Sequence, residues 1–126
     1  MPKTVPHLAG VPPSDYPFSQ VVEANGFVFL AGQVGSAPGV HGAVPGGIEA
    51  QTRAMLDNVR QLLEAAGLGF GDVVKCTVYL VDFSEFAAMN AVYREYFPTE
   101  PPTRATVEVT RLALGARIEI EVLATR

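Results

Sequence analysis

The stretch VVEANGFVFLA (residues 21–31) decides the fold class, because it places two β-forming runs on either side of Asn25-Gly26. Asn-Gly between two such runs is the strongest short sequence signal for a β-hairpin. The second run, residues 27–31, is apolar at every position, which predicts a strand covered on both faces. Before the hairpin, residues 1–17 are rich in proline and polar groups and are expected to form an extended arm.

Two amphipathic helices are expected farther along the chain. Residues 48–66 place apolar side chains on one face at helical spacing, and Gly67 supplies a C-terminal stop. A second helix is expected to begin at a capping box, with Asp82 as N-cap and Glu85 three positions later, and to run to about Tyr96. The buried stripe of this helix is predicted to consist of Phe86, Met89, Asn90 and Tyr93.

Further strands are expected at residues 73–81 and in two alternating runs, 106–111 and 117–123, which are predicted to form a second hairpin. The resulting order, ββ-α-β-α-ββ, predicts an α+β fold with a mixed sheet and two helices on one face, in a single domain of residues 1–126. Two helices cannot cover both faces of such a sheet. The other face is therefore expected to meet another subunit.

Composition supports an oligomer and limits the partners. Hydrophobic residues make up 48% of the 126 residues and charged residues only 17%, so a small domain has more apolar surface than its own core can hold. A net charge of −4 and a pI near 5.0 argue against nucleic-acid binding. The single cysteine, Cys76, lies in an apolar run and is expected to be a small buried side chain in a reducing compartment. No signal peptide or membrane span is recognisable, so a soluble, cytoplasmic protein is expected.

Several kinds of chemistry lack sequence support. His7 and His41 lie in segments expected to be flexible, and no cluster of Cys, Asp or Glu accompanies them, so no metal site is expected. No glycine-rich nucleotide motif follows a strand, so a nucleotide cofactor lacks support, and no G-x-S-x-G nucleophile elbow is present.

The stretch PPTRATVEV (residues 101–109) carries the main functional candidate, Arg104, at the start of a strand behind two prolines. In the predicted C-terminal hairpin, Arg104 shares a sheet face with Glu119 and Glu121, and Glu119 lies ~13 Å along the sheet. That separation leaves room for a small anionic ligand and a water molecule. Spacing alone does not choose between the two carboxylates, and a solvated or inter-subunit salt-bridge face explains the same pattern.

The same C-terminal residues resemble a known family. PTRATVEV (residues 102–109), then Leu112 and IEIE (residues 118–121), closely resemble the C-terminal signature of the RidA (YjgF) family. Five earlier segments resemble other parts of that family, so that the resemblance covers nearly the whole chain: residues 17–20, 29–34, 56–59, 63–67 and 86–93.

The resemblance implies a chorismate-mutase-like (YjgF-like) fold and a homotrimer whose sheets pack inward, with ligand clefts between subunits. It also implies an activity that needs no cofactor: hydrolysis of reactive enamine or imine intermediates, of the 2-aminoacrylate type, to 2-keto acids and ammonia. The expected ligand is a small 2-imino or 2-keto acid. The alternative within the family is a non-catalytic trimeric ligand- or protein-binding protein, with a chaperone-like or translation-inhibitor role. An endoribonuclease role fits poorly with the acidic pI and the lack of an acid/base histidine.

By the same resemblance, Arg104 holds the substrate carboxylate through its planar guanidinium, and Glu119 positions and activates the attacking water. Backbone groups near Gly32 and Thr106 are expected to fix the substrate. Asn90 either supports the site or is a hydrogen-bonded core amide.

Three positions depart from the pattern of the well-studied deaminating members. Phe18 stands where a tyrosine is common, and Tyr16 is a candidate replacement for its hydroxyl. Ala31 replaces a serine and Thr106 a cysteine. These departures leave the rate and substrate preference open, including a neighbouring subgroup with a different amine or imine substrate.

Overall fold

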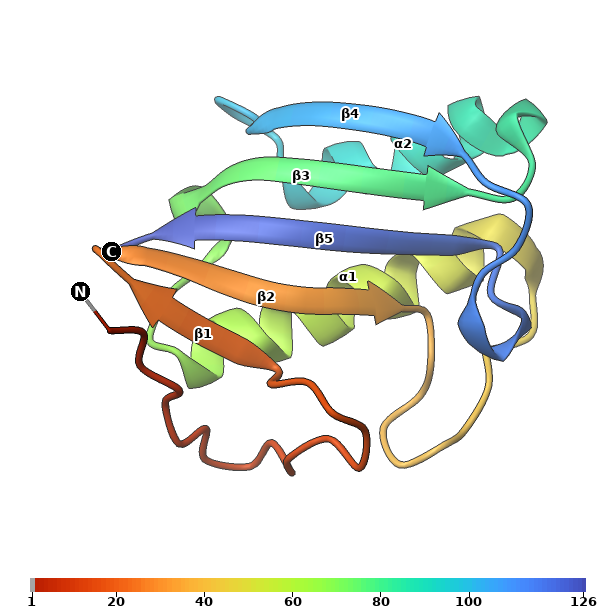
Figure 1. Ribbon diagram of the computed structural model, residues 1–126. Helices are drawn as coiled ribbons and strands as arrows, with labels where there is room; N and C mark the ends of the chain where they lie inside the picture. The colour runs from red at the N-terminus through yellow and green to blue at the C-terminus, as the bar shows by residue number, and fades with distance from the viewer. Residues whose placement is uncertain (1) are drawn as a thin grey trace.

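A computed structural model describes residues 2–126 and contains one five-stranded sheet and two α-helices (Figure 1). The sheet order is β1-β2-β5-β3-β4, in which β3 and β4 are parallel and every other neighbouring pair is antiparallel. The predicted α+β class is confirmed. The elements are β1 (Val21–Ala24), β2 (Phe27–Val34), α1 (Gly47–Ala65), β3 (Val73–Leu80), α2 (Phe86–Tyr96), β4 (Thr103–Glu108) and β5 (Ile118–Thr125).

The N-terminal hairpin is confirmed. Asn25 and Gly26 have φ angles of 52° and 81°, which is the left-handed conformation that both central residues of a type I′ turn require. Strand β2 continues to Val34, beyond the predicted end at residue 31. Its register against β5 shifts between Leu30 and Gln33, which marks a β-bulge.

Helix α1 is also confirmed, and Gly67 terminates it as expected. The Gly67 and Leu68 amides donate to the carbonyls of Glu64 (3.0 Å) and Leu63 (2.8 Å), and Gly67 has a φ of 78°. This is a Schellman motif, in which glycine adopts the left-handed conformation at no steric cost. The apolar face of α1 packs against β2 and β5 and holds four of the fully buried side chains: Met55, Leu56, Val59 and Leu63.

Helix α2 begins differently from the prediction. The Asp82 carboxylate accepts hydrogen bonds from the Ser84 amide (2.9 Å) and hydroxyl (2.6 Å), as an N-terminal cap does. The Glu85 carboxylate does not complete a capping box, because it binds the Arg117 guanidinium instead, at 2.7 Å. A charged donor makes a stronger hydrogen bond than a backbone amide. The buried residues of α2 are Met89, Val92 and Tyr93, whereas Phe86 and Asn90 are only half-buried.

The predicted C-terminal hairpin is wrong. Strand β5 does not pair with β4 but lies between β2 and β3, and β4 pairs in parallel with β3 at the edge of the sheet. The alternate side chains Ile118, Ile120, Val122 and Ala124 of β5 are all buried, so a central position buries more apolar surface than an edge would. The connection, residues 109–117, is long enough to carry the chain across.

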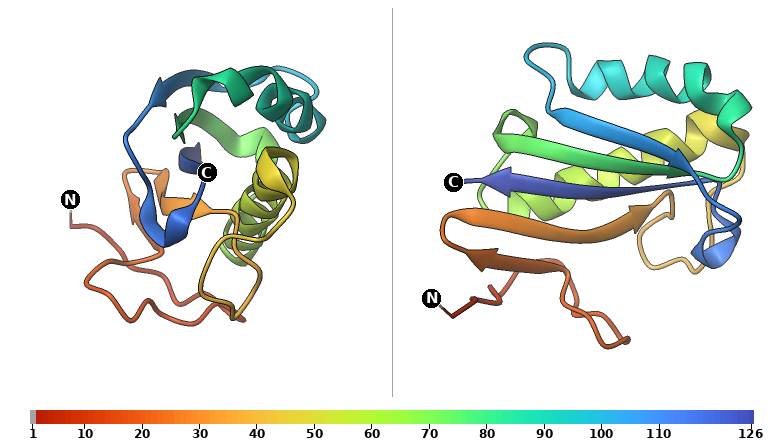
Figure 2. Two further views of the ribbon diagram at one scale, coloured as in Figure 1. Left: turned by 90° about the vertical axis from the view of Figure 1, so that its right-hand side faces the viewer. Right: turned by 45° about the horizontal axis from the view of Figure 1, so that its top comes forward.

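Both helices cover the same face of the sheet (Figure 2). The opposite face is open in the single chain, where Phe27, Phe29 and Val107 are 44%, 45% and 41% exposed. Within the single chain strand β2 is therefore covered on one face, and the second covering layer that its apolar run predicts would have to come from another subunit. Among residues 2–126, no helix has the length and hydropathy needed to cross a membrane.

Candidate functional site

Glu119 lies near the start of β5 and faces away from the helices. Its neighbours Ile118 and Ile120 are fully buried in the core, and side chains alternate along a strand. Gly32 lies directly against it: a Cβ atom at this position would lie 2.4 Å from Glu119 Oε2. Gly32 and Ala31 form the bulge of β2 and together lie opposite Glu121 of β5. The family resemblance predicts that backbone groups near Gly32 fix the substrate, and in the structure the Glu119 carboxylate lies against this glycine.

Glu119, Gly32 and Ala31 line an open hollow of about 640 Å³, here called the Glu119 hollow. The N-terminal arm adds Tyr16 and Phe18, and the turn before β5 adds Leu114. Three of the residues assigned by resemblance, Phe18, Ala31 and Gly32, are therefore brought together with Glu119.

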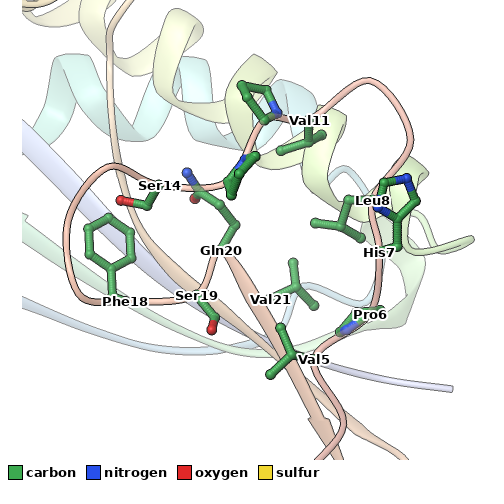
Figure 3. A pocket seen from close by; sticks show the side chains of 12 residues that line it. Val5, Pro6, His7, Leu8, Val11, Ser14, Phe18, Ser19, Gln20 and Val21 are labelled. Carbon is green, nitrogen blue, oxygen red and sulfur yellow. The ribbon is translucent and has the colours of Figure 1, made fainter.

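The N-terminal arm is held to the sheet beside this hollow. Thr4 and Glu23 exchange two backbone hydrogen bonds of 2.8 Å, and Leu8 is buried in the core. A pocket of about 240 Å³ remains between the arm and β1, lined mainly by apolar side chains (Figure 3). Phe18 lines both this pocket and the Glu119 hollow.

The surroundings of Glu119 in this hollow raise the pKa of its carboxyl group, which suits it to accept and release a proton. Partial burial raises the pKa of Glu119, and the nearby charge of Glu121 raises it further. Tyr79 donates a hydrogen bond to Glu121, which in turn raises the pKa of the tyrosine. Within residues 2–126, Glu119 itself has neither a hydrogen-bond partner nor an ion-pair partner, so its oxygens are available to a ligand or a water molecule.

Arg104 lies in a second hollow, of about 270 Å³, on the other side of the sheet, here called the Arg104 hollow. Its guanidinium carbon lies 4.7 Å from the centre of the Tyr93 ring and 5.5 Å from that of Phe86, both on α2. Such distances correspond to cation–π contacts. Asn90 and Pro102 also line this hollow, and the Asn90 side chain makes no hydrogen bond within the described chain. No described carboxylate pairs with Arg104, which leaves the guanidinium free to bind an anion.

Two buried hydroxyls lie near Arg104. Tyr93 Oη and Thr106 Oγ1 are inaccessible to solvent and make no hydrogen bond of standard geometry within residues 2–126, although Tyr93 Oη lies close to the Cys76 thiol and the Arg104 guanidinium. Thr106 is two residues along β4 from Arg104 and therefore on the same face. Burial also raises the pKa of the Cys76 thiol to about 11, so the thiol is protonated at neutral pH and is a poor nucleophile.

Arg104 and Glu119 do not share a sheet face, and the sequence-based expectation that they do is wrong. Arg104 is paired with Cys76, which faces the helices, whereas Glu119 is paired with Tyr79 on the outer face. Since β3 lies between β4 and β5, the Cα atoms of Arg104 and Glu119 are two strand spacings apart across the sheet and three residues apart along it, which is roughly 14 Å. Their side chains point in opposite directions, so one small ligand cannot meet both within one chain.

The structure also adds residues that the sequence did not assign to a site. His41, expected in a flexible loop away from any chemistry, lines the Glu119 hollow. Tyr93 and Phe86, predicted only as core side chains, hold Arg104. No group of three or more His, Cys, Asp or Glu side chains within residues 2–126 is arranged to hold a metal ion.

Comparisons with known proteins identify the family of the chain. The family model described as endoribonuclease L-PSP matches residues 10–126. A RutC family protein of Pyrococcus horikoshii is 48% identical over 86% of this chain and 86% of its own length. A 2-iminobutanoate/2-iminopropanoate deaminase of Capra hircus is 39% identical over 94% of this chain and 86% of its own length. The crystal structure of the YjgF gene product from E. coli superposes with a TM-score of 0.84 at 41% identity, covering 91% of this chain and 92% of that one. The chain therefore belongs to the endoribonuclease L-PSP family, which is the RidA (YjgF) family that its C-terminal motif resembles.

Proposed function

We propose that the protein is a cofactor-independent hydrolytic deaminase. It converts reactive enamine or imine intermediates, of the 2-iminopropanoate and 2-iminobutanoate type, to 2-keto acids and ammonia. Membership of the family and the similarity to a named deaminase support this activity. The chemistry of the two hollows supports it as well. One offers a guanidinium without a counter-ion, and the other offers a carboxylate with a raised pKa.

The observation that carries the proposal is the placement of these two groups on opposite faces of the sheet. A complete site then takes Arg104 from one chain and Glu119 from a neighbouring copy. The open outer face, with Phe27, Phe29 and Val107 exposed, provides apolar surface for packing between copies. The proposed assembly is a homotrimer with a cleft at each subunit boundary, as the family resemblance implies, and a head-to-tail contact repeated around a three-fold axis closes into such a ring.

In this site the substrate carboxylate binds the Arg104 guanidinium, which offers two parallel hydrogen bonds. The Glu119 carboxylate of the neighbouring chain accepts a proton from a water molecule as that water attacks the imine carbon. The C=N double bond becomes a C–N single bond in the carbinolamine. Proton transfer to nitrogen, and removal of the hydroxyl proton, then break the C–N bond. One water is consumed and one ammonia is released for each 2-keto acid, and no carbon changes its oxidation level.

The test is the hydrolysis of 2-iminobutanoate, generated in situ by an amino-acid oxidase and followed by trapping with semicarbazide. Wild-type protein is expected to accelerate loss of the imine. Arg104→Ala should lower kcat/KM by about 100-fold, and Glu119→Gln should lower kcat by about 100-fold or more. Arg111→Ala is a matched control, because Arg111 is exposed and lines neither hollow.

Equal rates with and without wild-type protein would overturn the proposed activity. If a titration shows that 2-keto acids bind to the wild-type protein but no imine is hydrolysed in the assay, the non-catalytic ligand-binding alternative is favoured instead.

A further inference from the structure

Leu114 has a backbone conformation that leucine rarely adopts. It lies in the turn Ala113–Gly115 before β5, with φ 62° and ψ 19°, in the left-handed helical region. A side chain with a Cβ atom is disfavoured there, and glycine or asparagine is the usual occupant. Burial does not offset this strain, since 49% of Leu114 is exposed. Backbone strain of this kind is concentrated at ligand sites in proteins.

The Leu114 side chain lines the Glu119 hollow, where it is one of three large, exposed residues. The others are Tyr16 and Phe18 of the N-terminal arm, which are 65% and 51% exposed. Two separate segments of the chain thus present apolar groups to the cavity that holds the unpaired carboxylate. A ligand that covers apolar surface around a cavity removes that surface from water, which favours binding.

The size and charge of the hollow restrict what can cover these groups. In the single chain the hollow measures about 640 Å³, which gives room both for the neighbouring copy that brings Arg104 and for a ligand larger than a three-carbon imino acid. No lysine or arginine lines it, and its one carboxylate is Glu119. An acidic substrate side chain would lie near Glu119, with no lysine or arginine in the lining to offset its charge and His41 as the one basic side chain.

We propose that Leu114, with Phe18 and Tyr16, forms the binding wall for the substrate's side chain. The preferred substrates are then 2-imino acids with bulky aliphatic or aromatic side chains, and Leu114 is a specificity-determining residue. This inference rests on the proposed deaminase function, because it assigns a substrate class to the same site. The strained turn places the Leu114 side chain at the cavity, and since the side chain is half exposed, packing in the core does not explain its position.

The experiment compares kcat/KM for imines generated from leucine, phenylalanine, alanine and glutamate, with wild type and Leu114→Asn. Asparagine tolerates the left-handed conformation and is similar in size, so the turn is retained while the apolar wall is lost. Wild type should prefer the leucine and phenylalanine imines over the alanine imine by about fivefold or more, as expected for a few methylene groups placed against an apolar wall. The glutamate imine should be the poorest substrate. Leu114→Asn should bring the leucine-to-alanine ratio close to one.

Val40→Asn is the matched control. Val40 is 58% exposed and does not line the Glu119 hollow, so its replacement should leave the ratio at the wild-type value. A leucine-to-alanine ratio that is the same in wild type and Leu114→Asn would overturn the inference.

Binding of the product keto acids separates this inference from the proposed function. Calorimetric titration with 4-methyl-2-oxopentanoate and with pyruvate should show tighter binding of the larger acid by wild type, and a smaller difference for Leu114→Asn. If this difference is found without any imine hydrolysis, the deaminase proposal fails while the apolar wall stands. If imines are hydrolysed but Leu114→Asn changes neither the rate ratio nor the binding difference, only the wall is wrong.

Discussion

Arg104 and Glu119 project from opposite faces of one five-stranded sheet, Arg104 towards the helices and Glu119 away from them. The insertion of β5 between β2 and β3 causes this arrangement, because it leaves β4 as an edge strand paired only with β3. Each charged group lies in its own hollow without an opposite charge. The two hollows therefore hold complementary groups, a guanidinium that can bind an anion and a carboxylate that can accept a proton.

Gly32→Ala should disable Glu119 with little loss of stability. The added Cβ would lie 2.4 Å from Glu119 Oε2, so the carboxylate must move, but no backbone atom lies among the nearest contacts. A displacement of about 1 Å in a catalytic group can cost about 100-fold in rate. We expect that loss in kcat/KM for imine hydrolysis, with a Tm close to wild type in calorimetry.

The control for this change is Gly71→Ala. Nothing lies within 4 Å of a Cβ at Gly71, so the activity should match wild type. Full activity of Gly32→Ala would show that the position of Glu119 against the bulge is not required.

Tyr93→Leu should weaken substrate binding through Arg104. The Tyr93 ring lies 4.7 Å from the guanidinium carbon and fixes its position, and a contact of this kind contributes about 0.5–2 kcal/mol. We expect KM, and the dissociation constant for pyruvate, to rise by about 3- to 10-fold with a smaller change in kcat.

Tyr93→Phe is the matched variant, because it keeps the ring and removes a buried hydroxyl that makes no hydrogen bond of standard geometry within residues 2–126. Its KM should stay within about twofold of wild type, and its free energy of unfolding should be unchanged or higher by about 1 kcal/mol. A rise in KM for Tyr93→Phe as large as that for Tyr93→Leu would assign the effect to the hydroxyl and not to the ring.

Glu121→Gln should move the acidic limb of the pH profile. The charge of Glu121 is one of the two causes that raise the pKa of Glu119, after burial. Removing that charge lowers the pKa of Glu119, so the carboxylate remains ionised to a lower pH. If Glu119 acts as the base, the acidic limb of kcat/KM shifts to lower pH. An unshifted limb would mean that another group controls it.

Glu119→Gln should stabilise the fold at neutral pH while it removes activity. The folded-state pKa of Glu119 lies above its ordinary value of 4.5, so ionisation opposes folding. The stability that Glu119 contributes to the wild-type fold is therefore fully present below its ordinary pKa and is lost as the pH rises through its folded-state pKa. Denaturant unfolding should show the variant as the more stable protein at pH 7, with a smaller difference at pH 4. A less stable variant at pH 7 would contradict the assigned direction of the pKa.

The local parts of the fold were predictable because local signals decide them. Asn25-Gly26 forms the expected turn, and Gly67 ends α1 as expected. The place of β5 was not predictable from such signals, because alternation shows which face of a strand is buried but not which strand lies beside it. The predicted hairpin needed only residues 112–116 as its loop, which is a length that hairpins commonly use, so the loop length gave no sign against it.

The candidate site was predictable only in part, for a related reason. Gly32 was assigned through the family resemblance, and Arg104 was singled out because it followed two prolines at a strand entrance. The face on which each side chain lies depended on the pairing of β4, so the geometric relationship between Arg104 and Glu119 was inferred incorrectly. His41 and Leu114 carry no local signal, because their turns reach the hollow only after the sheet has formed.

The measurement that tests the central claim most directly is complementation between two inactive chains. Arg104→Ala and Glu119→Gln are purified separately, mixed in equal amounts, unfolded and refolded together, and assayed for imine hydrolysis. If each site takes Arg104 from one chain and Glu119 from its neighbour, random assembly leaves about one quarter of the sites with both groups, so about 25% of wild-type activity should return. Refolding each variant alone controls for the procedure and should give no recovery. If the mixture is as inactive as its two parents while refolded wild type regains activity, the two groups do not act across a subunit boundary, and the account is contradicted.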